Sequence, residues 1–288
     1  MSQDRLNASL DIDRRSTLEI VRIIQEQDAL VAPAVAAEAE HIAHAIDEIT
    51  NRLSHGGKLF YAGAGTSGRI AMLDAAELPP TFGIDPSLVR VLMAGGERAY
   101  FAAAEGAEDD EDAAIAAVER QVRADDAVMG IAASGTTPYT VAAIRKANMI
   151  GALTVGITSQ PGSPLAQEAD IAITPQTGPE VIMGSSRMKS GTAQKLILNT
   201  ISTAVMIRLG HVYSNLMIDM PATNEKLRGR AVRMVELAAG VPRSTATQAV
   251  RDANGNVRLA VVIAKKRISA DEARKLLQSG NLREALEA

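Results

Sequence analysis

The sequence predicts an α/β protein: a parallel sheet flanked by helices, with helices before the sheet and a small helical module after it. Two observations support this prediction. Between residues 59 and 173, short apolar runs of strand length alternate with stretches of helical periodicity, as in successive β-α-β units. At two strand ends the chain passes through glycines and hydroxyls into a helical stretch, namely Gly63-Ala64-Gly65-Thr66-Ser67-Gly68 and Ala133-Ser134-Gly135-Thr136-Thr137-Pro138.

Local signals place the elements in chain order. Ser16 and Glu19 have the spacing of a capping box, in which each side chain binds the other residue's backbone N–H group, so a helix is expected to start there. A second helix is expected over 33–53, before the pattern changes at Gly56-Gly57. The predicted strands are 59–62, 89–93, 127–132, 153–157 and 171–173, and the helices between them are 68–77, 110–123 and 138–149.

The remainder of the chain is predicted to be mainly helical. A long helix is expected over 186–209, with Gly210 as its stop. Beyond Met234, glycine and proline interrupt the pattern, so three short helices are expected there. We predict three domains: an N-terminal helical segment over 1–55, the sheet domain over 56–233 and a helical module over 234–288.

Composition limits the classes of function. The chain has 288 residues, 47% hydrophobic and 22% charged, a balance typical of globular proteins. A net charge of −4 argues against nucleic acid as a partner, and the absence of cysteine excludes disulfides, zinc–thiolate sites and thiol nucleophiles. No apolar segment reaches membrane-spanning length, the N-terminus lacks a signal-peptide core, and the four histidines form no metal-binding pattern. We expect a cytoplasmic protein that binds neither a membrane nor a metal.

The two glycine–hydroxyl loops have the chemistry of a phosphate site. A turn of this kind lets backbone N–H groups approach an anion, and the N-terminus of the following helix favours negative charge. At the carboxyl ends of neighbouring strands, two such loops would form the crevice in which open α/β sheets bind ligands. We expect a phosphomonoester held by the hydroxyls of Thr66, Ser67, Ser134 and Thr137.

Other interpretations of these loops stay open. Gly63-x-Gly65-x-x-Gly68 also matches the dinucleotide-binding fingerprint, with Glu97 as the acid on the ribose, and it also fits a purely structural turn. The hydroxyls of the second loop could simply cap the helix that Pro138 begins.

A third hydroxyl-rich segment, 184–192, brings two cations to the start of the long predicted helix. Cations beside an exposed helix N-terminus would reinforce an anion site, so Ser186 and Lys189 are further candidates for binding the phosphate. Equally, Ser186 could cap the helix, and Arg187 and Lys189 could be solvated.

Two glutamates are candidates for acid–base catalysis. Glu77 is expected near the end of a helix, because Pro79 disfavours helical geometry at Leu78, and the negative helix end together with burial would favour its protonated form. Glu108 is expected at the start of the next helix, whose positive end would keep it anionic. We therefore predict Glu77 as the acid and Glu108 as the base. The alternative for Glu108 is that it only stabilises the helix, as its acidic neighbours are expected to do.

Several motifs together resemble those of the N-acetylmuramic acid 6-phosphate etherase family. They lie at 63–69, 73–83, 94–96, 105–109, 184–195, 215–217 and 222–227, and the similarity extends over nearly the whole chain. The resemblance implies a sugar isomerase (SIS) fold, a homodimer, and cleavage of the D-lactyl ether of N-acetylmuramic acid 6-phosphate into N-acetylglucosamine 6-phosphate and D-lactate, with no cofactor. It also implies that the family's two catalytic glutamates are Glu77 and Glu108.

The chain departs from the family's pattern at two places. Ala76 and Leu78 flank Glu77 where the family commonly has serine and cysteine, and Thr136 stands where the family often has arginine. Both departures concern local hydrogen bonds. The C-terminal module resembles a ubiquitin-associated three-helix fold and is expected to serve packing.

Elimination followed by hydration fits these residues. In the open-chain sugar, the C1 aldehyde makes the C2 proton acidic, and the lactyl ether at C3 is placed to leave. Glu108 would remove the C2 proton, and Glu77 would protonate the lactate oxygen and then activate the water that adds at C3. Two other functions stay open: an aldose–ketose sugar-phosphate isomerase, which needs no leaving-group acid, and a non-catalytic sugar-phosphate sensor related to glucokinase regulatory protein.

Overall fold

The computed structural model describes residues 4–222, 224–278 and 281–287. Its contacts divide the chain into two compact units. The first, which we call the sheet unit, consists of Met1–Ala75 and Ser87–Val205, and the second, the helical unit, consists of Ala76–Pro86 and Met206–Ala288. Contacts within one chain do not test which segments fold independently, so the three predicted domains stay a prediction.

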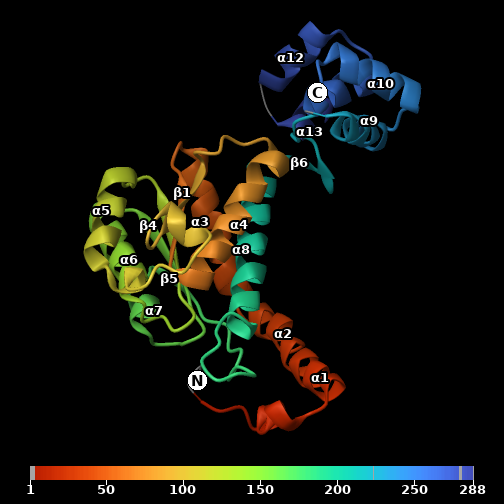
Figure 1. Cartoon of the computed structure of the whole chain (residues 1–288). Coiled ribbons are helices and arrows are strands. Elements are labelled where there is room, and N and C mark those ends of the chain that lie inside the picture. The colour runs from red at the N-terminus through yellow and green to blue at the C-terminus, as the bar shows by residue number, and fades with distance from the viewer. Residues whose placement is uncertain (1–3, 223, 279–280, 288) are drawn as a thin grey trace. The chain divides into compact units, whose positions relative to one another are not determined.

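The sheet unit is built on five parallel strands in the order β2-β1-β3-β4-β5 (Figure 1). All five predicted strands are confirmed, with bounds that differ by at most one residue. They are β1 (Leu59–Gly63), β2 (Val89–Met93), β3 (Ala127–Ile131), β4 (Leu153–Ile157) and β5 (Ile171–Ile173). The strands are short and mostly apolar because helices cover both faces of the sheet, as in other parallel sheets.

Alternate strand residues face opposite layers of helices. Phe60 and Ala62 of β1 belong to a core formed with α5 (Glu111–Gln121), α6 (Pro138–Ile150) and α7 (Pro164–Glu168). Helices α5 and α6 follow the predicted spans closely, whereas α7 was not predicted. On the opposite face, α3 (Ala39–Ser54) contacts β4 and β5. Figure 1 shows the two helical layers on either side of the strands.

The N-terminal helices confirm the predicted start but not the predicted single second helix. Ser16 and Glu19 form the expected capping box at the start of α1 (Thr17–Asp28). The second helix is two helices, α2 (Val31–Ala36) and α3, separated at Glu38. The Glu38 carboxylate accepts a hydrogen bond from the distant backbone N–H of Thr174, at 3.1 Å, which fixes the turn between the helices. Two short 3-10 turns, at Asn7–Ser9 and Ile12–Arg14, precede α1.

Helix α4 (Gly65–Phe82) is longer than the predicted 68–77, and the expectation that Pro79 ends it is wrong. Pro79 and Pro80 lie in its last turn, so only a few residues follow the backbone N–H groups that they remove. The helix ends at Gly83, whose N–H donates to the Pro79 carbonyl at 2.9 Å and whose φ of +65° is in the left-handed region.

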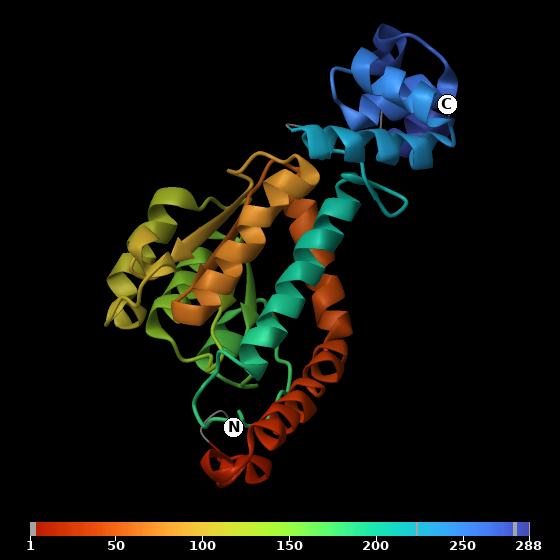
Figure 2. The same ribbon diagram turned by 45° about the vertical axis from the view of Figure 1, so that its right-hand side comes forward.

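The long predicted helix is confirmed as α8 (Lys189–Arg208), which starts three residues later than expected and stops before Gly210. It runs beside α4 in both ribbon views (Figures 1 and 2). A buried carboxylate on α4 joins them: Asp74 accepts from Asn199 at 2.6 Å and from Ser202 at 3.0 Å. Tyr61 of β1 donates to the same carboxylate at 2.9 Å, and burial beside Asp74 raises the pKa of the Tyr61 hydroxyl.

The helical unit has one short helix more than predicted. Within its described residues, a hairpin of β6 (Val212–Tyr213) and β7 (Leu216–Met217) precedes α9 (Glu225–Ala239), and four helices follow Gly240 instead of three. They are α10 (Arg243–Asp252), α11 (Val257–Lys266), α12 (Ala270–Gln278) and α13 (Leu282–Glu287). Reciprocal hydrogen bonds between Ser269 and Glu272 begin α12, a capping signal that the sequence interpretation overlooked.

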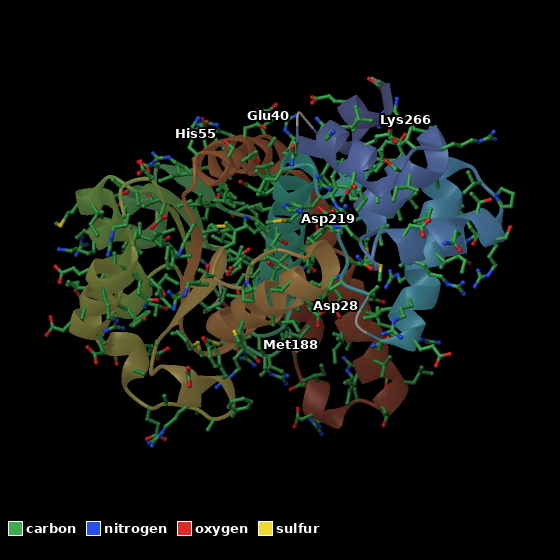
Figure 3. The ribbon with its side chains drawn as sticks, turned by 90° about the horizontal axis from the view of Figure 1, so that it is seen from above. Asp28, Glu40, His55, Met188, Asp219 and Lys266 are labelled. Atoms are coloured by element: carbon green, nitrogen blue, oxygen red, sulfur yellow. The ribbon has the colours of Figure 1, made fainter. Side chains whose placement is uncertain are left out.

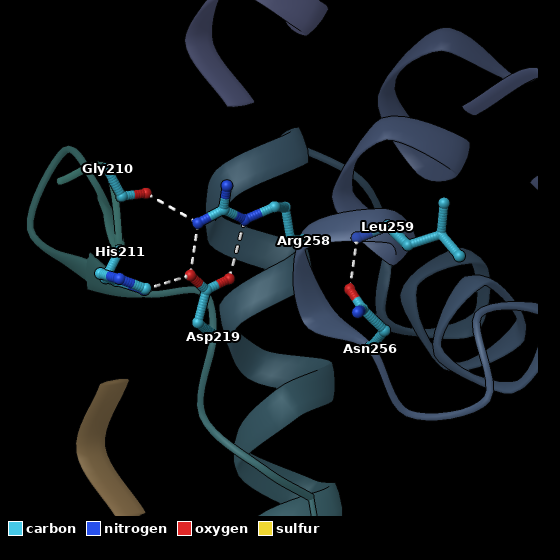
Figure 4. Close-up of polar contacts among 6 residues, drawn as sticks. All are labelled: Gly210, His211, Asp219, Asn256, Arg258 and Leu259. Carbon is cyan, nitrogen blue, oxygen red and sulfur yellow. Dashed lines mark hydrogen bonds and ion pairs between the residues drawn. The ribbon is translucent and has the colours of Figure 1, made fainter. Parts of the chain in front are cut away.

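One polar cluster joins the hairpin segment of the helical unit to α11 (Figure 4). The Asp219 carboxylate accepts hydrogen bonds from His211 Nδ1 at 2.9 Å and Arg258 Nε at 2.8 Å, and it also pairs with Arg258 Nη2. Burial raises the pKa of Asp219, but the hydrogen bonds and charges of His211 and Arg258 outweigh it and hold that pKa below its usual value. His211 therefore has a structural partner within the helical unit.

No helix among the described residues combines the length and the apolarity that a membrane crossing requires. Within the same residues, no group of three or more His, Asp or Glu side chains is arranged to hold a metal ion.

Candidate active site

The two predicted phosphate loops lie side by side at the carboxyl ends of β1 and β3. The chain leaves β1 for β2 on one side and reaches β3 on the other, so the order β2-β1-β3 contains a topological switch point at β1. Gly63 and Ile131, the last residues of the two strands, are register partners. The structure thus brings together the loops that start at Ala64 and Ala132.

The glycines of the first loop have a packing role. Gly65 has a φ of +53°, in the left-handed region that glycine adopts without strain. A Cβ atom on Gly68 would lie 2.2 Å from Met93 Sδ and 2.9 Å from the Gly63 carbonyl oxygen. Only glycine therefore lets α4 start this close to β1 and β2. The structural-turn interpretation is correct for these glycines, but it leaves the hydroxyls without a role.

Thr66 and Ser67 open α4 with hydroxyls that the chain itself does not use. Thr66 is half-buried and Ser67 is buried. Among the described residues, neither hydroxyl has a hydrogen-bond partner, and no side chain caps the first N–H groups of α4. The N-terminal N–H groups of a helix have no partner within the helix, so this end of α4 can donate to an anion.

The helix that follows the second loop, α6, also starts without a side-chain cap. Thr137 occupies the N-cap position of α6, but its side chain makes no capping hydrogen bond, so the simple capping interpretation is wrong for this residue. Ser134 Oγ accepts from the Thr136 backbone N–H at 3.2 Å and from the Thr136 hydroxyl at 3.0 Å. Its own proton remains available to a ligand. Pro138 is the first residue of α6, as predicted.

The third segment differs, because the N-terminus of α8 is not exposed. Glu180, fully buried at 0% exposure, accepts hydrogen bonds from the backbone N–H groups of Lys189 and Ser190, each at 3.0 Å. The expectation of an exposed anion site at this helix end is therefore wrong. A Cβ atom on Gly191 would lie 3.5 Å from the Ser186 carbonyl oxygen and 3.8 Å from Thr66 Cγ2, so this segment still lies beside the first loop.

Lys189 is buried at 1% exposure rather than solvated. Its Nζ donates to Gln27 Oε1 of α1 at 2.9 Å, and Figure 3 labels Asp28 next along α1 and Met188 just before α8. Burial lowers the pKa of the Lys189 ammonium, although the charges of Glu180 and Asp28 oppose that effect. Lys189 thus links α8 to α1, and its contact with the phosphate stays a prediction, as does that of Ser186.

Glu108 lines a pocket of about 230 Å³ at the start of α4. Glu108 lies in a 3-10 turn, Ala107–Asp109, that contacts α6, while Asp110 caps α5 by accepting from the Ala113 N–H at 2.8 Å. The side-chain cap of α5 is therefore Asp110, whereas Glu108 lines the pocket. The pocket's other lining residues include Gly65, Arg69, Glu105 and several alanines.

Glu77 does not line this pocket. It lies on α4 twelve residues after Gly65, in the segment that belongs to the helical unit. Its side chain is exposed, so the burial expected from the sequence is absent in a single chain. Within one chain, therefore, Glu108 lines the pocket and Glu77 is exposed outside it.

Two residues of the site were missed by sequence reasoning. Glu180 lies in an irregular segment nine residues before the helix that it caps, and no local motif signals such a cap. Arg69 belongs to the first motif, and its position one turn after Thr66 on α4 was a usable signal that it faces the same side.

Comparison with known proteins gives one match over residues 41–148 and others over nearly the whole chain. A family model of the N-terminal SIS domain of glucokinase regulatory protein matches residues 41–148. N-acetylmuramic acid 6-phosphate etherase of Symbiobacterium thermophilum is 57% identical over 262 residues, which cover 91% of this chain and 87% of the relative. The protein of the same name from Escherichia coli O1:K1 / APEC is 49% identical over 283 residues, which cover 97% of this chain and 95% of the relative.

Solved structures share the fold. Phosphoheptose isomerase of Francisella tularensis superposes with a TM-score of 0.52 at 18% identity, covering 67% of this chain and 100% of that one. The phosphoheptose isomerase of Neisseria gonorrhoeae gives a TM-score of 0.50 at 16% identity, covering 65% of this chain and 96% of that one. The parallel sheet flanked by helices is therefore the SIS fold.

Proposed function

The chain belongs to the N-acetylmuramic acid 6-phosphate etherase family, and on this basis we propose that it cleaves the D-lactyl ether of N-acetylmuramic acid 6-phosphate. The products are N-acetylglucosamine 6-phosphate and D-lactate, in the cytoplasmic recycling of cell-wall amino sugars. The main structural support for the proposal is the pocket that Gly65 and Glu108 both line. It lies at the start of α4, and the strand order places the start of α6 at the same edge of the sheet.

The reaction is an elimination followed by hydration. Glu108, exposed within its pocket, removes the C2 proton of the open-chain sugar, which the neighbouring aldehyde acidifies. A second carboxyl group, that of Glu77, protonates the lactate oxygen as it leaves C3, and water then adds to the unsaturated aldehyde. The aldehyde accepts the electron pair, so the chemistry requires no cofactor. Each proton transfer contributes about 10²–10⁴-fold to the rate.

The phosphate binds where the chain leaves donors unused. Thr66 and Ser67 at the start of α4, and Ser134 and Thr137 before α6, supply hydroxyls next to helix N-termini that stabilise a dianion. Ser186 supplies a further hydroxyl, since its segment lies beside Thr66. Binding at the phosphate, remote from C2 and C3, holds the flexible open chain in a reactive position.

A second copy of the chain completes the site by supplying Glu77. On α4, Met72 and Leu73 are 37% and 59% exposed, and Ala76 and Glu77 follow one turn later on the same helical stripe. A partner that covers this apolar stripe would bury Glu77 and could carry it to the pocket of the other subunit. A two-fold homodimer makes the exchange reciprocal and gives two equivalent sites.

Release of D-lactate, measured enzymatically, tests the reaction. The Glu77→Gln and Glu108→Gln variants should each fold and lose turnover.

Mixed dimers test whether the site is shared between subunits. The two variants are mixed in equal amounts and refolded together. If the two carboxylates come from different subunits, the mixture should recover about a quarter of the unmodified rate, because half of the dimers are mixed and each mixed dimer has one intact site. No recovery in dimers that have demonstrably exchanged subunits would place both carboxylates in one chain.

The same assay separates the other functions. A sugar-phosphate isomerase would interconvert aldose and ketose without releasing lactate. The match to the SIS domain of glucokinase regulatory protein makes a sensor the second candidate, and a sensor would bind the sugar phosphate without consuming it. Incorporation of ¹⁸O from solvent water into the C3 hydroxyl of the product supports elimination and hydration.

A further inference from the structure

The pocket around Glu108 has a distinctive lining. Half of its lining residues are alanines, and one is a cation, Arg69. The others are two glycines, Met93 and two glutamates. The alanines are Ala64, Ala94, Ala99, Ala103, Ala104 and Ala107. A small apolar surface beside one cation complements a small ligand group that carries both a methyl and a carboxylate.

Arg69 is held firmly at the edge of this pocket. Its Nε donates to the Tyr100 carbonyl oxygen at 3.3 Å and its Nη2 to the Ala102 carbonyl oxygen at 2.9 Å. These two bonds fasten the loop that forms the alanine wall to α4 and fix the plane of the guanidinium. Within the described chain, Nη1 has no hydrogen-bond partner. The guanidinium is therefore preorganised, with donors to spare.

Charge in the pocket decides which part of a ligand can enter. Glu105 and Glu108 both line it, so a carboxylate would be repelled unless a cation offset their charge. Arg69 is the one cationic side chain in the described lining, and a guanidinium binds a carboxylate through parallel hydrogen bonds. A neutral acetamido group would gain much less from the same cation.

From this juxtaposition we propose that Arg69 is the specificity-determining residue for the lactyl arm of the substrate: it binds the lactyl carboxylate, and the alanine wall receives the lactyl methyl. The proposal rests on the proposed function and extends it. It directs the lactyl arm toward Arg69 and leaves C2 facing Glu108, while the phosphate lies at the hydroxyl loops.

The test compares two ligands that differ only in the lactyl arm. The dissociation constants of N-acetylmuramic acid 6-phosphate and N-acetylglucosamine 6-phosphate are measured by calorimetry, in a Glu108→Gln background that slows turnover by about 10²–10⁴-fold. Adding Arg69→Met should weaken binding of the first ligand by roughly 10- to 100-fold, as expected for a charge-assisted hydrogen-bond pair, and change the second by less than about twofold. Arg69→Lys, which keeps a cation, should lose less.

Arg98→Met is the matched control. Arg98 is an exposed arginine in the loop that forms the alanine wall, and it does not line the pocket. Equal weakening of both ligands by Arg69→Met and Arg69→Lys would assign Arg69 to the phosphate or to loop structure, and no change in either ligand would remove it from the site. Either result overturns the proposal. Failure of the proposed function is seen separately, as the absence of D-lactate release by the unmodified chain.

Discussion

The N-termini of α4 and α6 differ from that of α8, although all three follow segments rich in glycine and hydroxyls. At α8, the buried Glu180 carboxylate accepts hydrogen bonds from the first two backbone N–H groups. At α4 and α6, no described side chain does so, and the hydroxyls of Thr66 and Thr137 have no partner.

The difference separates a helix end that the chain caps from two helix ends that it leaves uncapped. A helix N-terminus favours an anion in either case. Where the chain supplies its own carboxylate, the helix is fixed in the core and a ligand cannot compete. Where the chain supplies none, and two such ends meet at a switch point, the donors remain available, and in our proposal they bind the substrate phosphate. Sequence motifs alone do not distinguish the two cases, because the capping carboxylate comes from a separate segment.

The largest expected effect is on turnover in the pocket at the start of α4, one of the two uncapped helices. Glu108→Gln should lower kcat for D-lactate release by about 10²–10⁴-fold, because the base that removes the C2 proton is lost. Its melting temperature should stay within the error of the unmodified protein, since Glu108 is exposed and does not cap a helix. Substantial remaining turnover would remove Glu108 from the mechanism.

The next effect concerns stability at the capped end. Glu180→Ala should lower the free energy of unfolding by roughly 3 kcal/mol, because two backbone donors at the start of α8 lose a charged acceptor in a buried site. Denaturant titration measures the change. Glu26→Ala, which removes an exposed glutamate that is not in the first turn of a helix, is the control and should change stability by less than about 0.5 kcal/mol. Similar losses in the two variants would contradict the capping role of Glu180.

A smaller effect is expected on substrate affinity. Thr137→Val should raise KM by roughly 10- to 100-fold through loss of one hydrogen bond to a charged phosphate, with a smaller change in kcat. Thr192→Val removes an exposed hydroxyl near the capped end of α8 and should leave KM unchanged. Steady-state kinetics on both variants measures the contrast, and an unchanged KM for Thr137→Val would exclude that hydroxyl from the phosphate site.

The smallest effect is on the pH dependence of stability in the helical unit, where the Asp219 carboxylate is paired with His211 and Arg258. The pKa of Asp219 is lower in the folded state than its ordinary value, so its stabilising contribution is complete above the unfolded pKa and disappears as the pH falls through the folded pKa. Asp219→Asn should therefore cost about 1 kcal/mol near neutral pH and progressively less in acid below about pH 4. Denaturant titrations at several pH values test this, and a cost independent of pH would contradict it.

Much of the fold could be predicted from the sequence, because short apolar runs of a parallel sheet are bounded by clear turn residues. The strand 153–157 and the helix that Pro138 begins are examples. The end of α4 was mispredicted because a proline in the last turn of a helix removes few hydrogen bonds, so Pro79 did not act as a stop. The division of the second N-terminal helix depends on a contact of Glu38 with Thr174, which is remote in sequence.

The site could be predicted only in part. Both glycine–hydroxyl loops follow from local patterns, and the sheet order brings them together as expected, while their binding of phosphate stays a prediction. The capping of α8 by Glu180, the burial of Lys189 and the exposure of Glu77 all depend on how distant segments pack. The environment of Glu77 further depends, in our proposal, on a second copy of the chain, and a single sequence carries no signal for how two copies meet.

The position of the phosphorus atom in a crystal structure of the Glu108→Gln variant with N-acetylmuramic acid 6-phosphate is the most direct test. We predict that the phosphate oxygens lie within hydrogen-bonding distance of the hydroxyls of Thr66, Ser67 and Thr137, between the starts of α4 and α6. A phosphate bound anywhere else, with these three hydroxyls left empty, would contradict the assignment of the open helix ends to the substrate.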